Sequence, residues 1–240
     1  MLRAEARRLA TAVQFLTRLP VRGSGAAGDL EAACRYFPLV GLLVGGLIAG
    51  WYLLALQLWS HDMACALALA LGVLLTGAFH EDGFADSCDG FGGGWQREDV
   101  LRIMKDSRLG TYGGLGLVLL LGGKWLALVA IAPAQVPLAL LLAHSGGRAL
   151  AVACMRGLDY CRMDASSKVR PVATAIRRRD LLISLLWPLL LLPWLPWQQS
   201  LAAGLLLLLL RWSCQRWFRA RLGGYTGDCL GAAEQLGELG

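Results

Sequence analysis

The sequence has 240 residues, of which 56% are hydrophobic and 17% charged, and its mean hydropathy is +0.53. An ordinary soluble domain is about a quarter charged, so this composition excludes a soluble globular protein and predicts an all-α integral membrane protein. Because one membrane span takes about 20 residues, the length predicts a single membrane-embedded domain over residues 1–240, a polytopic bundle of about six transmembrane helices.

Residues 3–17 are predicted to form an amphipathic helix that lies at the cytoplasmic membrane interface. Arg3, Arg7 and Arg8 precede a short apolar run, which Arg18 closes. The run is brief and has no convincing small-residue cleavage site, which argues against a secretory signal peptide. A helix of this kind presents its basic side to the lipid headgroups.

Six apolar segments follow along the chain. They are Phe37–Trp59, Met63–Ala78, Gly113–Ile131, Val136–Cys154, Leu181–Trp197 and Leu201–Leu210. The last two are the least regular, because Pro188, Pro193 and Pro196 interrupt the fifth and Arg211 closes the sixth early. Proline is tolerated in membrane helices where neighbouring groups satisfy the freed carbonyls.

The basic residues predict which way these spans run. Every Lys and Arg except Lys124 and Arg148 falls in four regions, 1–36, 80–112, 156–180 and 211–240. Six spans place all four regions on one side, and the positive-inside rule makes that side, with the N-terminus, cytoplasmic. The net charge of +6 therefore follows from membrane topology and predicts contact with anionic lipids, with no nucleic acid as a partner.

Three aspartates stand directly after the second apolar segment, within the stretch from Glu81 to Gly90. Asp82, Asp86 and Asp89 are spaced i, i+4, i+7, which puts their carboxylates on one face of a helix. Clustered carboxylates repel one another unless a cation lies among them, and hard oxygen ligands beside a phosphate substrate suit Mg²⁺. The alternative is a solvated first helical turn in which negative charge is merely favourable.

A polar, glycine-rich stretch then leads into the third span. It offers phosphate ligands in Lys105, Ser107, Arg108 and Thr111, with Asp106 among them. The helix that begins here also points its first backbone amides at this place, so the stretch predicts an anion-binding site. The alternative is a polar loop with a glycine-rich helix start.

Two charges, Lys124 and Arg148, lie inside predicted spans. Such residues normally face a polar interior with a partner, so we expect both to be paired and Arg148 to belong to, or support, the binding site. In the C-terminal stretch, Asp228 and Glu234 follow a glycine-rich lead that suits either a helix cap or the approach of a nucleotide, and Glu234 shares a helix face with Glu238.

Five blocks taken together resemble the cobalamin synthase family, the adenosylcobinamide-GDP ribazoletransferases. The blocks are Phe15–Val21, Phe37–Gly41, Thr76–Gly90, Ile103–Gly114 and Gly224–Glu238. They occur in the family's order, so that the resemblance spans most of the chain, and the blocks Asp-Gly-x-Ala-Asp-x-x-Asp-Gly and Asp-Ser-Arg-x-Gly are specific.

The resemblance implies a Mg²⁺-dependent transferase on the cytoplasmic face of the bacterial inner membrane. Adenosylcobinamide-GDP and α-ribazole, or α-ribazole 5′-phosphate, would be its substrates, and GMP the leaving group. Asp82, Asp86 and Asp89 map onto the family's acidic metal motif. Lys105 and Arg108 would then hold pyrophosphate oxygens, and Asp89 or Asp106 would take the hydroxyl proton. Association with other late cobalamin-pathway enzymes and oligomerisation stay open.

Two other functions stay in view. The CDP-alcohol phosphotransferases also join an alcohol to an activated phosphate with aspartates on membrane helices, but their motif has Ala-Arg where this chain has Ala85-Asp86. A small cation-coupled transporter would favour acids near mid-membrane and repeated halves. Here the acids lie at the end of a span, and the sequence has no repeat.

Overall fold

The computed structural model describes residues 2–23, 27–161 and 176–240, which are helical almost throughout. The N-terminal half contains α1 (Leu2–Leu16), α2 (Ala27–Ala33), η1 (Cys34–Tyr36), α3 (Phe37–Ala55), α4 (His61–Thr76), α5 (Phe79–Gly93) and α6 (Arg97–Ile103). The C-terminal half contains α7 (Thr111–Ala130), α8 (Val136–Met155), α9 (Arg178–Leu189), η2 (Leu192–Trp194), α10 (Trp197–Leu222) and α11 (Gly227–Leu239). The predicted all-α fold is confirmed, and α1 matches the predicted N-terminal helix.

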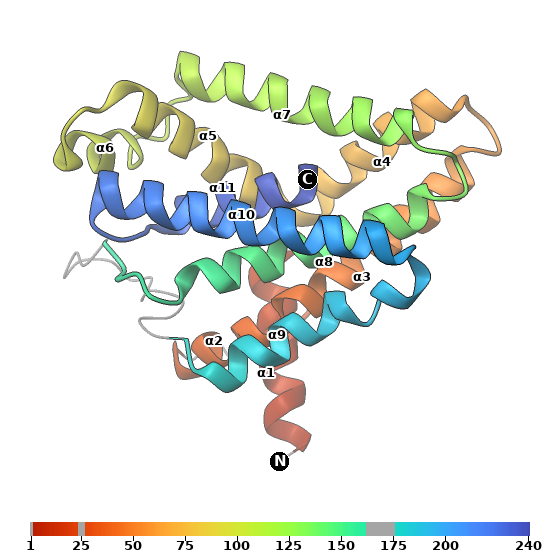
Figure 1. The fold of residues 1–240 in the computed structure, drawn as a ribbon, viewed down its shortest axis with the longest axis horizontal. Coiled ribbons are helices and arrows are strands. Elements are labelled where there is room, and N and C mark those ends of the chain that lie inside the picture. Colours follow the sequence, from red (N-terminus) through yellow and green to blue (C-terminus); the bar gives the residue numbers. More distant parts are fainter. Residues whose placement is uncertain (1, 24–26, 162–175) are drawn as a thin grey trace.

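Helices α7, α8 and α10 run along the long axis of the molecule, and α11 turns back among them so that the C-terminus lies near the centre (Figure 1). Helices α3 and α8 pack closely against each other. A Cβ atom at Gly41 or Gly45 would overlap the backbone of His144 or Leu140, so these glycines let the two helices touch. Gly41 and Gly45 of the first predicted span therefore act in helix packing, whereas a Cβ atom at Gly50 would meet nothing within 4 Å.

A sharp bend between α4 and α5 sets the direction of the helix that carries the three aspartates. The two helices meet at 90°. Gly77 and Ala78 both have positive φ angles, 68° and 59°, and Ala78 is a residue type that rarely adopts this conformation. A residue with a Cβ atom loses about 1–2 kcal/mol in this conformation.

Arginine side chains tie together the end of the bundle where α5, α8 and α10 finish (Figure 1). Arg97 donates to the carbonyl of Leu222 at 2.8 Å, and Arg219 donates to the carbonyl of Gly157 at 2.9 Å. Arg221 donates to the carbonyls of Phe91 and Gly94. These bonds satisfy carbonyls that the helix ends leave without intrahelical partners.

The spans differ from the sequence prediction in the second, fifth and sixth segments. Among the described residues, three helices are long and apolar enough to cross a membrane, or four if the bent pair α4–α5 is one span. The fifth segment breaks at its prolines, so α9 ends at Leu189, whereas α10 extends past Arg211 to Leu222. The exact number of crossings and the cytoplasmic N-terminus stay predictions, and the basic region 156–180 lies partly outside the described residues.

Candidate active site

The three aspartates all lie in α5, which confirms the predicted helix. Asp82 is exposed, and Asp86 and Asp89 are partly buried. Seven residues of α-helix rise about 10 Å, so Asp82 and Asp89 cannot ligate the same ion from this helix alone. Asp86 lies between them and can share an ion with either neighbour.

Helix α11 brings a fourth acid to the same place. A Cβ atom at Gly83 would lie 3.1 Å from the Cα atom of Asp228, and one at Gly231 would lie 3.1 Å from the carbonyl of His80. The backbones of α5 and α11 therefore touch where both helices carry glycine. Asp228, in the first turn of α11, is held against the turn of α5 that links Asp82 and Asp86.

The Asp89 side chain caps the N-terminus of α7. Its two carboxylate oxygens accept hydrogen bonds from the backbone amides of Gly110, at 2.7 Å, and Gly113, at 2.8 Å. A side chain at either glycine would collide with this carboxylate. The sequence predicted that the α7 N-terminus binds an anion, and in the structure Asp89 is an anion bound there.

The loop before α7 presents its polar side chains to the exterior. Lys105, Ser107, Arg108 and Thr111 are all exposed. Arg108 forms a fork with Asp106, with Nε and Nη2 donating at 3.0 and 2.6 Å. Hydrogen bonds from the Arg108 side chain and backbone lower the pKa of Asp106 to about 2. A carboxylate with so low a pKa is a weak base at neutral pH.

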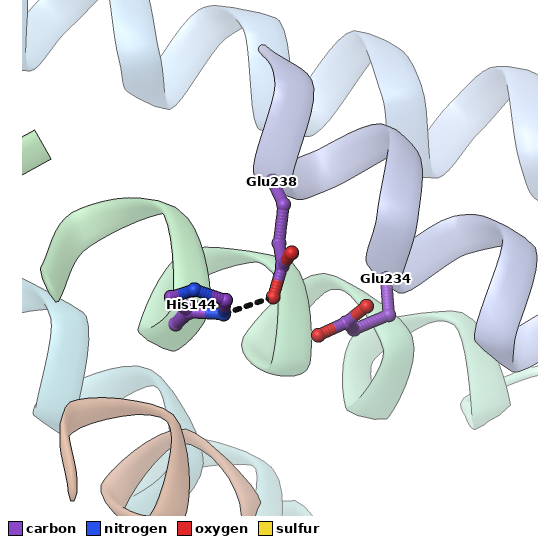
Figure 2. A group of neighbouring side chains, drawn as sticks. All are labelled: His144, Glu234 and Glu238. Carbon is purple, nitrogen blue, oxygen red and sulfur yellow. Dashed lines mark ion pairs between the residues drawn. The ribbon is translucent and has the colours of Figure 1, made fainter. Parts of the chain in front are cut away.

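A buried charge network lies between α7, α8 and α11, and Figure 2 shows three of its members, His144 of α8 and Glu234 and Glu238 of α11. Glu238 pairs with Lys124, Nζ to Oε2 at 2.7 Å, with Arg148, Nη1 to Oε1 at 3.0 Å, and with His144. Glu234 pairs with the same Arg148 nitrogen, its Oε1 at 2.8 Å. The partners that we expected for Lys124 and Arg148 are therefore the two glutamates of α11.

Gln235 extends this network to α5. Its side-chain oxygen accepts from Lys124 at 2.6 Å, and its nitrogen donates to Glu234 at 3.1 Å and to Glu81 at 3.2 Å. Glu81 directly precedes Asp82. The network therefore fixes α11, with Asp228, against the first turn of the acidic helix.

Two predicted substrate-binding residues lie inside the network. Arg148 is 1% exposed and Glu234 is fully buried, so in this structure they support the site from within. Ligand atoms of His144, Glu234 and Glu238 lie within 4.8 Å of one another, a spacing that suits a metal ion. Lys124 and Arg148 already neutralise both glutamates there, so this cluster is explained without one.

The sequence prediction missed Gln235, Glu81 and His80, whose Nδ1 lies 3.8 Å from Oε1 of Glu234. Residue type alone does not mark Gln235 as a member of a buried network. Nor does it separate Glu81 from the aspartates that follow it. The balance of charge does mark the centre of the network. Lys124 and Arg148 are cations inside spans and need acidic partners, and Glu234 and Glu238 stand one turn apart on one helix.

Comparison with known proteins shows what the chain resembles over nearly its whole length. The family described as Cobalamin-5-phosphate synthase matches residues 8–240. A relative from Leptothrix cholodnii, named Adenosylcobinamide-GDP ribazoletransferase, is 44% identical over 98% of this chain and 93% of its own. Relatives of the same name from Shewanella frigidimarina and Vibrio cholerae are also 44% identical, over 95% of this chain and 89% and 88% of theirs. No solved structure matches the chain.

Proposed function

The chain belongs to the cobalamin-5-phosphate synthase family, and we propose that it acts as an adenosylcobinamide-GDP ribazoletransferase. The observation that carries this proposal is the 44% identity to relatives of that name, over almost the whole chain. The acidic face of α5 and the exposed basic loop beside it support the proposal. Transfer of a phosphoryl group from a pyrophosphate to an alcohol needs acids to hold a metal ion and cations to neutralise the phosphate oxygens.

In the proposed reaction, the 3′-hydroxyl of α-ribazole, or of its 5′-phosphate, attacks the phosphorus that carries the corrinoid. A new P–O bond forms to the ribazole, and the P–O bond of the pyrophosphate that leads to GMP breaks. The hydroxyl proton passes to a base. The products are adenosylcobalamin, or its 5′-phosphate, and GMP.

We propose that Asp82 and Asp86 hold Mg²⁺, with Asp228 beside them. All three are hard oxygen donors on touching helices, which is the donor set that Mg²⁺ prefers beside a phosphate substrate. Bound there, the ion would neutralise charge on the pyrophosphate oxygens. The same role for Asp89 stays a prediction, and its bonds to Gly110 and Gly113 support a further role in holding the loop in place.

The exposed loop is proposed to bind the pyrophosphate. Lys105, Ser107, Arg108 and Thr111 lie on the polypeptide that Asp89 ties to α5, so the loop and the acidic helix are fixed relative to each other. Asp106 holds the Arg108 guanidinium and has a lowered pKa, which favours a positioning role over that of the base. The cytoplasmic, inner-membrane position of this face is part of the proposal and is supported by the grouping of basic residues.

One assay tests the proposal. The purified protein in detergent is incubated with adenosylcobinamide-GDP, α-ribazole and Mg²⁺, and GMP release and the corrinoid product are followed. We expect both products in equal amounts, and neither when Mg²⁺ is chelated. Release of CMP from a CDP-alcohol, with no reaction of the corrinoid, would instead identify a CDP-alcohol phosphotransferase.

A further inference from the structure

A groove of about 330 Å³ lies on the side of α5 that faces away from the aspartates. It is lined by α5, α10 and α11, largely by apolar side chains such as Phe84, Phe91, Leu210 and Leu236. At 100° per residue, the lining residues of α5 point roughly opposite to its three aspartates. The groove is therefore separate from the proposed active site, and the inference below does not depend on the catalytic assignment.

The groove lies beside an outer surface of the bundle. Trp217 lines it and is 54% exposed, and Leu208 and Leu209 on the same helix are also exposed. Helix α10 lies at the front of the molecule in Figure 1. In a membrane protein, exposed leucines and tryptophan on one helix mark the surface that meets lipid, with tryptophan near the headgroups.

Arg221 stands at one end of the groove. It lies one helical turn beyond Trp217, with its guanidinium 5.7 Å from the centre of the Phe91 ring. Its Nη2 atom donates to the carbonyl of Gly94 at 2.5 Å, which fixes its position. A half-buried cation is thus held where an apolar groove meets the basic end of the molecule.

The lining of the groove includes a buried hydroxyl, that of Ser87, without a partner among the described residues. Ser87 is 3% exposed, and its hydroxyl makes no hydrogen bond with any residue that the structure describes. A buried hydroxyl without a partner is costly, so its presence in an apolar lining points to a ligand with an acceptor at that depth. Ser87 lies about one helical turn along α5 from Phe91, whose ring contacts the Arg221 guanidinium.

We propose that this groove binds one acyl chain of an anionic phospholipid. The chain fills the space between α5 and α10, the phosphate meets Arg221, and an ester carbonyl one turn deeper accepts a hydrogen bond from Ser87. The net charge of +6 and the arginines at this end favour an anionic headgroup. The lipid completes the packing behind α5, the helix that carries the aspartates.

Native mass spectrometry tests the proposal. The detergent-solubilised protein is given equal amounts of phosphatidylglycerol and phosphatidylcholine with matched acyl chains. We expect one retained phosphatidylglycerol per chain. Ser213→Trp fills the groove from an exposed position on α10 and should abolish retention, whereas Leu209→Trp, exposed elsewhere on that helix, should not.

The headgroup contact is tested by a matched pair of arginines. Arg221→Gln should lower phosphatidylglycerol retention about fivefold, the effect of one basic side chain on an anionic lipid. Arg216→Gln should have little effect, because Arg216 lies over Trp212 away from the groove lining. Equal retention by both arginine variants, or equal retention of the two lipids by the unaltered protein, would overturn the proposal.

A second measurement does not require the groove to be filled. Phosphatidylglycerol brominated on its acyl chains should quench tryptophan fluorescence, and Trp217→Phe should remove a saturable part of that quenching. Unchanged quenching in Trp217→Phe would contradict the proposed site. Retention of no lipid together with a dimer that Ser213→Trp dissociates would assign the groove to a second copy of the chain and overturn the proposal.

Discussion

Asp86 and Asp89 are less than one helical turn apart, and yet they meet different surroundings. Asp89 is bound by two backbone amides of α7, whereas Asp86 belongs to the turn of α5 that packs on Asp228. The i, i+4, i+7 spacing predicted the shared helix face correctly. It could not predict the partners of Asp89, because backbone amides more than 20 residues away carry no mark in the sequence.

The proposed metal ligands should be needed for turnover and not for folding. We expect Asp82→Asn and Asp86→Asn to lower kcat on the order of a hundredfold or more, as removal of an electrostatic catalytic contact does. Both proteins should insert in the membrane and keep their thermal unfolding temperature. The measurement is GMP release at several Mg²⁺ concentrations, and full turnover by an inserted Asp86→Asn protein would refute the assignment.

Asp89 should differ from Asp82 in its effect on stability. An Asn side chain offers only one oxygen, so Asp89→Asn leaves one amide at the start of α7 without its acceptor. The expected loss is about 1–3 kcal/mol in the free energy of unfolding. Asp82→Asn, at an exposed position of the same helix, is the control and should cost little. Equal stability of the two variants in a detergent unfolding titration would contradict the bonds to Gly110 and Gly113.

The ion pair between Asp106 and Arg108 should contribute equally to stability and to kcat/KM at every pH between 5 and 8. The folded-state pKa of Asp106, about 2, lies below its ordinary value. The stabilisation is therefore present above the ordinary pKa and is lost only as pH falls toward 2. Between pH 5 and 8 the pair stays ionised. Asp106→Asn should thus change kcat/KM for the corrinoid without moving the shape of its pH profile over that range, and a displaced limb would restore Asp106 as a candidate base.

At the scale of helices, α11 holds the site together. It contacts α5 through glycines and joins α7 and α8 through Glu234, Gln235 and Glu238. The sequence predicted that these charges need partners, but not which ones. The partner of a buried charge is set by the helices that pack against its span, and helix packing is not visible in the sequence. The 90° bend at Gly77 and Ala78, which directs α5 toward α11, likewise depends on tertiary contacts.

The pairing of Lys124 with Glu238 should show strong coupling. Lys124→Met removes one cation from a buried pair and should cost about 3–5 kcal/mol in the free energy of unfolding. The double variant Lys124→Met/Glu238→Gln removes both charges and should be more stable than the sum of the single effects predicts. Lys105→Met, on the exposed loop, is the control. Additive effects in a detergent unfolding titration would show that the pair does not interact as described.

On the scale of the whole molecule, part of the basic charge gathers at one end of the long axis. The connections around residues 60, 133 and 196 lie at one end of the long axis, and the ends of α5, α8 and α10 lie at the other (Figure 1). The arginines of α6 and of the last turns of α10 gather at the second end. The predicted sharing of one cytoplasmic side by all the basic regions stays a prediction, and α1, with its three arginines, lies below the middle of the molecule in Figure 1, at neither of these ends. Hydropathy overestimated how many segments form long apolar helices, because the prolines near residue 190 break the chain into shorter ones.

This division predicts the orientation of the protein in a cell. Arg178, at the start of α9, belongs to a basic region and should face the cytoplasm, whereas Gln198, at the start of α10, should face the opposite side. Each is changed to Cys in a background where the two partly exposed cysteines, Cys88 and Cys161, are Ser. A membrane-impermeant thiol reagent applied to intact cells should label Gln198→Cys, and Arg178→Cys only after permeabilisation. The opposite pattern would invert the topology and place the aspartates of α5 on the side of the membrane away from the nucleotide pool, which would also count against the proposed reaction.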